Sequence, residues 1–318
     1  MIELIYPKNG ITVCCHTPEQ EAFLCGEGEI HDSRSLDLSA PLPVRFRFSP
    51  ALSGEIILTD SRGRTRRYEA RGGEATVYNL LAGESYQWQV AVGAMMSGVG
   101  QFTVSDTLPR ILFVEGLSNI RDIGGYTTTD GKRIRQGLLF RSSEADTNQS
   151  ITPQGIRELT ESLGVRTDID LRGVNGESVR AALPWDRVKH HSFPLAAYGE
   201  IFTAEQKELY RQSFELLANE SIYPAIVHCA AGMDRAGSWL FVLGALIGID
   251  EGDLVLDYEL SSFSYWGARR RESHDLQGFL EQLHSYGRSA QSAAEGFLLD
   301  CGVTADILER IRRIFMEA

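Results

Sequence analysis

The sequence of 318 residues lacks any hydrophobic run that approaches the roughly 20 apolar residues of a membrane-spanning helix. It also lacks a basic leader: the opening Met-Ile-Glu-Leu-Ile-Tyr-Pro has an early acid and no Lys or Arg, so we expect no secretory signal. Only 31 Lys and Arg stand against 43 Asp and Glu, a net charge of −12, which argues against binding to nucleic acids or anionic membranes. We expect a cytoplasmic globular protein without a membrane span.

Cysteine is scarce, and the five that are present include one adjacent pair. An odd number of this kind does not build a disulfide framework, so a reducing compartment fits best. The pair Cys14-Cys15 has only His16 nearby and no second pair at a matching spacing. We therefore expect no metal site, and no cofactor of another kind.

The first part of the chain has the pattern of short strands. Val44 to Phe48 alternates polar and apolar residues, and two further stretches flank the turn signal at residues 60–63. We expect a small all-β sandwich domain over residues 1–106, followed by a second domain over residues 107–318. Residues 80–88 resemble a turn and strand of fibronectin type III modules.

The second part of the chain alternates strands with helices. Thr152 starts a predicted helix that Gly164 ends, and an apolar strand follows at residues 165–171. Thr203 and Gln206 predict a capping box at the start of a helix through residue 218, and the last helix is expected from residue 304 onward. This order is typical of an α/β domain whose central, mostly parallel sheet is flanked by helices.

The most informative stretch is His-Cys-Ala-Ala-Gly-Met-Asp-Arg-Ala-Gly-Ser over residues 228–238. An apolar strand precedes it and an apolar helix follows it, a geometry that points backbone N–H groups at an anion. Cys229 and Arg235, separated by five residues, can close around one phosphate. The helix N-terminus, the N–H groups and the guanidinium all favour the thiolate of Cys229, which is the nucleophilic form. Arg235 can grip two phosphoryl oxygens with its planar fork.

The alternative is that Cys229 is an inert buried side chain at a strand end. The preceding histidine, the internal glycine and the strand and helix on either side favour a phosphate-binding loop. His228 is expected to order the loop from behind. The substrate phosphate would be bound by residues throughout the loop: Ala230, Ala231, Gly232, Met233, Asp234 and Arg235.

Four ordered motifs carry a resemblance to a known family. The loop resembles the His-Cys-x-x-Gly-Lys-Asp-Arg-Thr-Gly of bacterial and fungal Cys-dependent tyrosine and dual-specificity phosphatases. Residues 119–125 look like that family's opening Asn-Phe-Arg-Asp-Leu-Gly-Gly, and residues 137–143 look like its next strand. Residues 170–172 with Glu177 resemble its Asp-Leu-Arg…Glu segment. The match covers about residues 115–318.

The resemblance implies a two-step mechanism in which Cys229 attacks phosphorus and water then hydrolyses the phosphocysteine. It makes Asp234 the favoured general acid; the alternative is that Asp234 caps the following helix. Asp186 is the second candidate acid. Asp170 is expected to orient Arg235 or the loop rather than to transfer protons.

Other basic residues have structural interpretations. Arg121 and its neighbour Asp122 are expected to tie down the domain's first segment. Arg172, like Cys229, follows a predicted strand, which places both at the edge of the sheet where ligands bind. The run Arg269-Arg270-Arg271 is expected to be a solvated helix face, with steering of the substrate as the alternative.

Two positions depart from the family pattern. Met233 stands where the family has Lys, which weakens selection for multiply phosphorylated ligands and leaves an apolar contact for an aromatic leaving group. Ala236 stands where the family has Thr, whose hydroxyl bonds the thiolate and helps it leave in the second step. Ser238 is a partial substitute, two residues further along the helix.

The sequence therefore predicts a phosphomonoester hydrolase, foremost a protein-tyrosine or dual-specificity phosphatase. Its partner is a phosphorylated protein or a small phosphomonoester, and its oligomeric state is left open. A phosphoinositide or inositol-phosphate phosphatase is one alternative. A phosphate-binding module with impaired turnover, suggested by Ala236, is the other.

Overall fold

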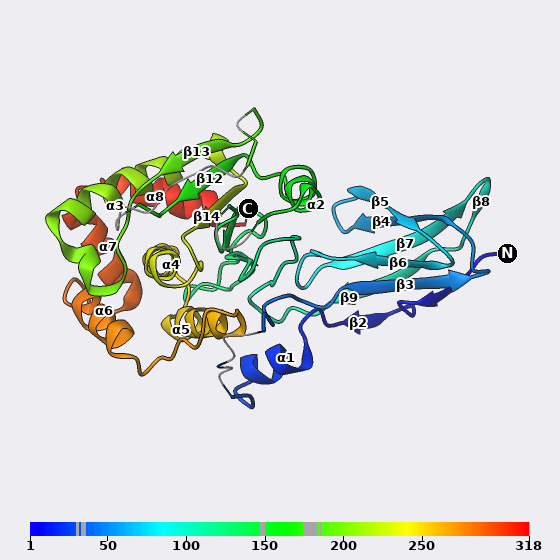
Figure 1. The fold of residues 1–318 in the computed structure, drawn as a ribbon, viewed down its shortest axis with the longest axis horizontal. Coiled ribbons are helices and arrows are strands. Elements are labelled where there is room, and N and C mark those ends of the chain that lie inside the picture. Colours follow the sequence, from blue (N-terminus) through cyan, green and yellow to red (C-terminus); the bar gives the residue numbers. More distant parts are fainter. Residues whose placement is uncertain (30–31, 33–35, 147–149, 174–182, 185, 318) are drawn as a thin grey trace. The chain divides into compact units, whose positions relative to one another are not determined.

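The computed structural model describes residues 1–29, 32, 36–146, 150–173, 183–184 and 186–317. The chain divides into two compact units (Figure 1). Unit 1 comprises Met1–Ala22 and Pro41–Phe113, and unit 2 comprises Phe23–Ala40 and Val114–Ala318. Residues 23–40 thus group with the second unit, although they precede most of the first in sequence. The domain boundary at residue 106 stays a prediction.

Unit 1 contains two sheets, in which β3, β4, β5 and β7 come from stretches that the sequence predicts and the other strands do not. The first has the order β1-β3-β6, with β1 at Glu3–Tyr6, β3 at Val44–Ser49 and β6 at Glu74–Val77. The second has the order β2-β9-β7-β4-β5, and a short β8 pairs with β7. Its strands are β2 (Ile11–Val13), β4 (Gly54–Asp60), β5 (Thr65–Ala70), β7 (Ser85–Val92), β8 (Met95–Met96) and β9 (Gly100–Val104). Strands β4 and β5 form the hairpin predicted around residues 60–63.

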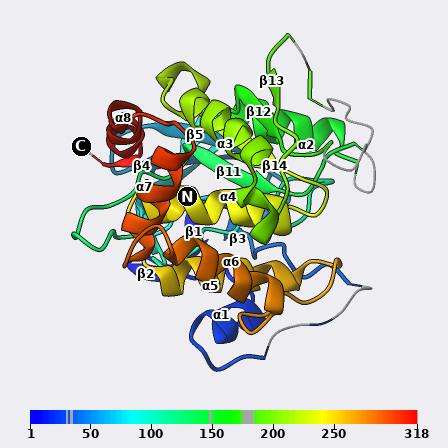
Figure 2. The ribbon, with the colours of Figure 1, turned by 90° about the vertical axis from the view of Figure 1, so that its left-hand side faces the viewer.

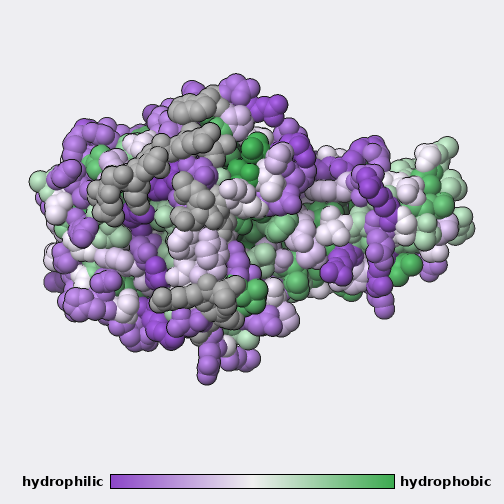
Figure 3. Space-filling view, in the orientation of Figure 1, coloured by the Kyte–Doolittle hydropathy of each residue, from purple (hydrophilic) through white to green (hydrophobic). Residues whose placement is uncertain are grey.

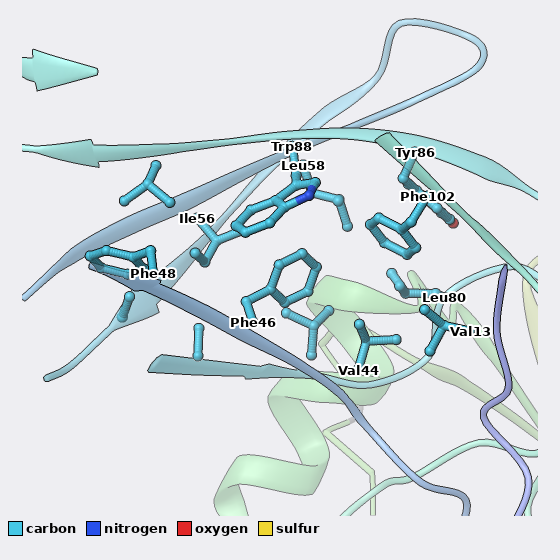
Figure 4. Packing of buried hydrophobic residues seen from close by; sticks show 14 of the residues in the cluster. Val13, Val44, Phe46, Phe48, Ile56, Leu58, Leu80, Tyr86, Trp88 and Phe102 are labelled. Atoms are coloured by element: carbon cyan, nitrogen blue, oxygen red, sulfur yellow. The ribbon is translucent and has the colours of Figure 1, made fainter. Parts of the chain in front are cut away.

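One hydrophobic core serves both sheets of unit 1. Phe46 of β3 is fully buried, and its ring lies 5.0 Å from the ring of Trp88 and 5.7 Å from that of Phe102, both on the other sheet. Figure 4 shows these rings pointing toward one another between the strands. The strict alternation of buried and exposed residues along β3 follows from this packing, because successive side chains point to opposite faces. The resemblance to fibronectin type III modules stays a prediction.

The surface of unit 1 has an apolar end. Met95 and Met96 of β8 are 47% and 53% exposed, and Val99 is 58% exposed. Figure 3 shows hydrophobic residues gathered near the hairpin of β7 and β8. Elsewhere on the face shown, hydrophobic residues form smaller patches among hydrophilic ones.

Unit 2 is built around a five-stranded mixed sheet of order β10-β11-β14-β12-β13. The strands are β10 (Arg121–Asp122), β11 (Leu139–Ser142), β12 (Thr167–Asp170), β13 (Lys189–Ser192) and β14 (Ala225–His228). Strands β11, β14, β12 and β13 are parallel neighbours, and β10 is an antiparallel edge. The mostly parallel sheet of the α/β prediction is confirmed. Strand β14 is central and fully buried along its length, as its Ala-Ile-Val sequence indicates.

Helices flank this sheet, and several contact one another (Figure 2). Helix α4 contacts α5 and α7, and α6 contacts α7. The α-helices are α1 (Pro18–Leu24), α2 (Pro153–Arg157), α3 (Ala204–Leu217), α4 (Asp234–Leu246), α5 (Glu251–Leu260), α6 (His274–His284), α7 (Ala290–Asp300) and α8 (Ala305–Phe315). Four short segments are π- or 3₁₀-helical: η1 (Glu158–Ser162), η2 (Tyr198–Phe202), η3 (Glu220–Ile222) and η4 (Ser261–Phe263). In the described part of the chain, no helix is long and apolar enough to cross a membrane.

Helix starts are partly as predicted. Thr152 and Thr304 cap α2 and α8 with their side chains. The capping box at Thr203 and Gln206 is wrong, because the Thr203 side chain makes no capping hydrogen bond. The Gln206 amide instead accepts a hydrogen bond from the N–H of Ala196 at 2.7 Å, which anchors the segment leading into η2.

Candidate active site

The loop with Cys229 connects the central strand to a helix. Cys229 directly follows β14, and α4 begins five residues later at Asp234. The predicted order of strand, loop and helix is present. Because β14 lies in the middle of the sheet, this loop emerges at the carboxyl edge of the parallel strands, where α/β folds bind ligands.

Three successive carbonyl groups of this loop bond to structure behind it. The carbonyl of Ala230 accepts from the N–H of Glu144 at 2.9 Å. The Asn119 amide donates to the carbonyls of Ala231 and Gly232 at 3.1 and 3.2 Å. In a trans peptide the N–H points away from the carbonyl, so the N–H groups that follow these three carbonyls point to the other side. This arrangement is an anion-binding nest.

Glycine is required within the loop by both dihedral angle and space. Gly232 has a φ of +67°, which non-glycine residues rarely adopt. A Cβ at this position would lie 2.2 Å from the carbonyl oxygen of Ser142 on β11. The loop can therefore lie flat against β11 only because residue 232 has no side chain.

Two buried arginines lie beneath the loop. Arg141 donates to the carbonyl of Gly232 and to the Asp257 carboxylate. Arg121 donates to the other Asp257 oxygen at 2.8 Å. Burial lowers the pKa of Arg141 to about 10, against the opposing effect of Asp257, so Arg141 stays charged at neutral pH. It therefore adds positive potential behind the anion nest.

His228 belongs to a charged chain behind the loop. Its Nε2 lies 3.0 Å from Oδ1 of Asp168, and the second oxygen of Asp168 lies 3.2 Å from Nδ1 of His190 on β13. Burial by itself lowers the pKa of His228, but the Asp168 carboxylate raises the pKa to about 9. His228 is thus a cation adjacent to Cys229 at neutral pH. The expectation that it orders the loop from behind stays a prediction.

Asp234 is clamped by an arginine that lies far away in sequence. Arg269 donates through Nε to Oδ1 at 2.6 Å and through Nη2 to Oδ2 at 2.8 Å. The hydroxyl of Tyr198 also donates to Oδ1. Burial alone would raise the pKa of Asp234, but Arg269 and Tyr198 keep the pKa below its usual value. Asp234 is therefore ionised at neutral pH in this structure.

The interpretation of residues 269–271 as a solvated helix face is wrong. The segment just before α6 is not helical, because Arg269 turns inward to Asp234. Arg271 forms a second fork-shaped pair with the buried Glu259. Arg270 is exposed.

A pocket of about 550 Å³ opens beside Arg235 and Asp234. It is walled by η2 and α6 residues, among them Tyr198, Glu200 and Asp275. A neighbouring pocket of about 500 Å³ shares several of these residues, and Arg269 and Arg270 line it. Arg235 is half-buried in the first turn of α4.

Asp170 and Arg172 form a structural pair. The hydrogen bonds described for Asp170 come from Arg172, at 2.7 Å from Nη2 and 3.0 Å from Nε. Arg172 also binds Glu144 at 2.8 Å and Asp146 at 2.7 Å. With three carboxylates around its guanidinium, Arg172 fixes the strand ends. Asp170 therefore pairs with Arg172. The expectation that Asp170 orients Arg235 or the loop stays a prediction.

The departures from the family pattern take different forms in the structure. Met233 is fully buried, so its side chain offers no surface to a leaving group. Ala236 is also fully buried. The hydroxyl of Ser238 donates to the carbonyl of Asp234 and accepts from the N–H of Tyr198, both at 2.9 Å. Ser238 is therefore engaged within α4 and η2 rather than at the thiolate.

The remaining predicted residues divide into three cases. Arg121 and Asp122 tie down their segment as expected: Asp122 accepts from the N–H groups of Gly124 and Gly137, at 2.9 and 2.7 Å. Asp186 is exposed. Glu177 lies outside the described residues.

Sequence reasoning missed several residues that shape the site. They are Asn119, Arg141, Asp168, Tyr198 and Arg269. The sequence did contain a signal for Asp168. It lies two residues before Asp170 on the same strand, so both side chains point to the same face of the sheet. Tyr198 and Arg269 had none, since only the tertiary fold brings them to Asp234.

Comparison with known proteins assigns the second unit. The model of the family described as "Tyrosine phosphatase family" matches residues 112–317, more than half of the chain. This chain belongs to the tyrosine phosphatase family. A relative from Cupriavidus necator, named "Putative tyrosine-protein phosphatase H16_A0669", is 25% identical over 179 residues. The match covers 46% of this chain and 61% of that protein, so it spans less than two thirds of the relative.

Two solved structures are also similar to this chain. The core catalytic domain of the PP-IP phosphatase SIW14 from S. cerevisiae, in complex with citrate, is 16% identical with a TM-score of 0.34. It covers 54% of this chain and 92% of that domain. Another structure of the Siw14 catalytic core is 16% identical with a TM-score of 0.32, covering 47% and 77%. These scores are low, and membership of the tyrosine phosphatase family rests on the sequence match.

Proposed function

We propose that this protein hydrolyses phosphomonoesters through a phosphocysteine on Cys229. The observation that carries the proposal is the loop itself, in which the carbonyls of Ala230, Ala231 and Gly232 are bonded from behind, so that the N–H groups that follow them point to the other side. Arg235 adds a guanidinium at the same loop. Such preorganised donors stabilise the charge of a phosphoryl group during transfer.

The reaction has two steps. The thiolate of Cys229 attacks phosphorus; the S–P bond forms as the P–O bond to the leaving group breaks. A general acid gives its proton to the leaving oxygen. Water then attacks phosphorus, its proton returns to the carboxylate of that acid, and the S–P bond breaks to give phosphate and the thiolate.

Asp234 remains the first candidate for the acid. It starts α4 and borders the pocket beside Arg235. Its pairing with Arg269 means that it must first take up a proton, which an arriving phosphate dianion favours because like charges raise a carboxyl pKa. Asp186 remains the second candidate.

The pocket favours substrates with one phosphate, such as phosphotyrosine. Glu200 and Asp275 line the pocket beside Arg235, and Glu272 lines its neighbour. These carboxylates repel additional phosphate groups. Fully buried Met233 stands where the family has a cation. We therefore expect higher kcat/KM for aryl phosphates and phosphotyrosine peptides than for inositol polyphosphates, and a side-by-side rate comparison tests this.

A steady-state assay with p-nitrophenyl phosphate tests the activity. Cys229→Ser should abolish turnover, because a hydroxyl is not ionised at neutral pH. Cys301→Ser is the matched control, since Cys301 is also buried but follows α7, away from the loop in sequence. Full activity in Cys229→Ser would overturn the proposal, as would an inactive wild-type protein that also forms no phosphocysteine.

A phosphate-binding module with impaired turnover is the second candidate function. Ala236 supports it, because no hydroxyl follows Arg235 and Ser238 is bonded elsewhere. Rapid mixing with an aryl phosphate separates the two. A stoichiometric burst of phenolate followed by negligible release would favour the binding module, and sustained turnover would favour the enzyme.

A further inference from the structure

The geometry points to Arg269 and Tyr198 as positioning residues for Asp234, holding its carboxylate at the rim of the Cys229 loop and neutralising its charge so that a phosphate dianion can bind. This inference rests on the proposed function and deepens it. It concerns two residues that touch Asp234 and that act through it on the substrate.

Arg269 and Tyr198 together form a clamp that binds both oxygens of the Asp234 carboxylate. Arg269 occupies both oxygens in a fork-to-fork arrangement, at 2.6 and 2.8 Å, the geometry in which Arg and carboxylate pair most strongly. Tyr198 donates to one of the same oxygens, and its own hydroxyl lies 2.9 Å from that of Tyr258 on α5. A single carboxylate thus joins α4 to η2, to α5 and to the segment before α6.

Both clamping residues are themselves held in place. The backbone N–H of Arg269 donates to the hydroxyl of Ser262 at 2.7 Å, and that hydroxyl donates back to the Arg269 carbonyl at 3.0 Å. Tyr198 has a φ of +54° and its N–H donates to Ser238 on α4 at 2.9 Å. A strained backbone persists only where the surroundings fix it. The positions of Arg269 and Tyr198 are therefore fixed by the surrounding structure, and their contact with Asp234 is not an incidental surface contact.

Neutralisation matters because Asp234 adjoins the phosphate site. A bare carboxylate next to Arg235 would oppose the positive potential that the loop offers to a dianion. The charged and titratable groups around Asp234 come from every neighbouring element. They are Arg235 from α4, Tyr198 and Glu200 from η2, Tyr258 from α5, His274 and Asp275 from α6, and Arg269, Arg270 and Glu272 from the segment before α6. Arg269 forms an ion pair with Asp234, with 2.6 Å between Nε and Oδ1.

Removal of the clamp has two opposite consequences. Without Arg269 the ionised form of Asp234 is no longer stabilised, so the carboxyl keeps its proton to higher pH. At a pH where Asp234 is still ionised, its charge opposes the incoming phosphate. The retained proton moves the basic limb of the pH profile of kcat to higher pH. The charge repulsion raises KM.

The experiment compares Arg269→Gln with Arg270→Gln in the full chain. Arg270 is the matched control, because it lines the same pocket, is exposed and lies next in sequence. With p-nitrophenyl phosphate we expect Arg269→Gln to raise KM about tenfold or more and to move the basic limb of kcat upward by about 1 to 3 pH units. Tyr198→Phe should move the limb in the same direction by less, and Arg270→Gln should leave it in place.

Arg269→Lys keeps the positive charge but loses the two-pronged guanidinium. This variant replaces Arg269→Gln in the experiment if Arg269→Gln does not fold. It should give an intermediate KM and a smaller shift of the limb. The inference is overturned if the Arg269 variants match Arg270→Gln in both quantities, or if they lose kcat with the limb unmoved, as a purely structural defect would. Those outcomes leave the proposed function intact as long as Cys229→Ser is inactive; an active Cys229→Ser overturns the proposed function itself.

Discussion

At the scale of the residue, Gly232 shows how closely the loop is fitted to the sheet. Its φ of +67° and the 2.2 Å approach that a Cβ would make to Ser142 both exclude a side chain. We expect Gly232→Ala to lower the free energy of unfolding by about 2 to 4 kcal/mol and to reduce kcat strongly, because the N–H groups of the loop would be displaced. Urea unfolding and steady-state kinetics measure the two effects.

Gly131→Ala provides the control for that experiment. Gly131 has a φ of +84°, but a Cβ there meets no atom within 4 Å. It should therefore lower stability by about 1 to 2 kcal/mol from the dihedral angle alone and leave kcat unchanged. If Gly232→Ala and Gly131→Ala changed stability and kcat equally, the inference that the loop fits closely against β11 would be wrong.

Ala236 offers a test of the second chemical step. Ala236→Thr restores the hydroxyl that the resemblance places at the thiolate, and we expect hydrolysis of the phosphocysteine to accelerate about tenfold, the effect of one hydrogen bond to a charged group. Ala236→Val is the control, because it adds the same bulk to this fully buried position without a hydroxyl. Single-turnover kinetics gives the rate of each step, and a faster second step in both variants would rule out the hydroxyl as its cause.

At the scale of the element, three parallel strands are joined by one charged chain. Strands β14, β12 and β13 contribute His228, Asp168 and His190, which pair at 3.0 and 3.2 Å. The pKa of His228 is raised to about 9 in the folded state, against about 6.5 in an unfolded chain. Its contribution to stability is therefore complete below about pH 6.5 and is lost as the pH rises to about 9.

The loss of this stability contribution at high pH gives a prediction for Asp168→Asn. Between pH 6 and pH 9.5 the wild-type protein should lose about 1 to 3 kcal/mol through this chain, and Asp168→Asn should lack that part of the loss. Thermal unfolding at the two pH values measures it. Glu161→Gln, which breaks the exposed pair with Arg187, should keep the wild-type dependence, and a dependence retained in Asp168→Asn would argue against the chain.

At the scale of the whole molecule, unit 2 includes a segment from the start of the sequence. Phe23 packs edge-on against Phe263 with ring centroids 5.5 Å apart, and the hydroxyl of Ser39 accepts from the N–H of Asn119 at 2.9 Å. Asn119 in turn holds two carbonyls of the Cys229 loop. Ser39 of this segment therefore supports the loop through Asn119.

Phe23→Ala tests this support. We expect it to cost about 3 kcal/mol, as for a buried aromatic ring, and to increase hydrogen exchange at the N–H of Asn119 together with a lower kcat. Leu36→Ala is the control, because Leu36 belongs to the same segment and is 55% exposed. Unchanged exchange at Asn119 in Phe23→Ala would show that the segment does not support the loop.

The sequence alone determined the features that depend on neighbours along the chain. The strand, loop and helix around Cys229 follow from an apolar run, a glycine and a second apolar run, and β3 of unit 1 follows from strict alternation. These patterns are local, because side-chain direction repeats with a fixed period in strands and helices. The mostly parallel sheet followed from the alternation of the two kinds of element.

Only the tertiary structure decided which distant groups meet at the loop. Arg269 and Tyr198 reach Asp234 from 35 and 36 residues away, and the Arg run that contains Arg269 had the composition of a solvated surface. Gln206 had the spacing of a capping residue, but the Ala196 N–H offers its amide a better partner. Met233 had the polarity for contact with a ligand, but packing buries it. Each of these outcomes depends on long-range packing, which leaves no periodic signal in the sequence.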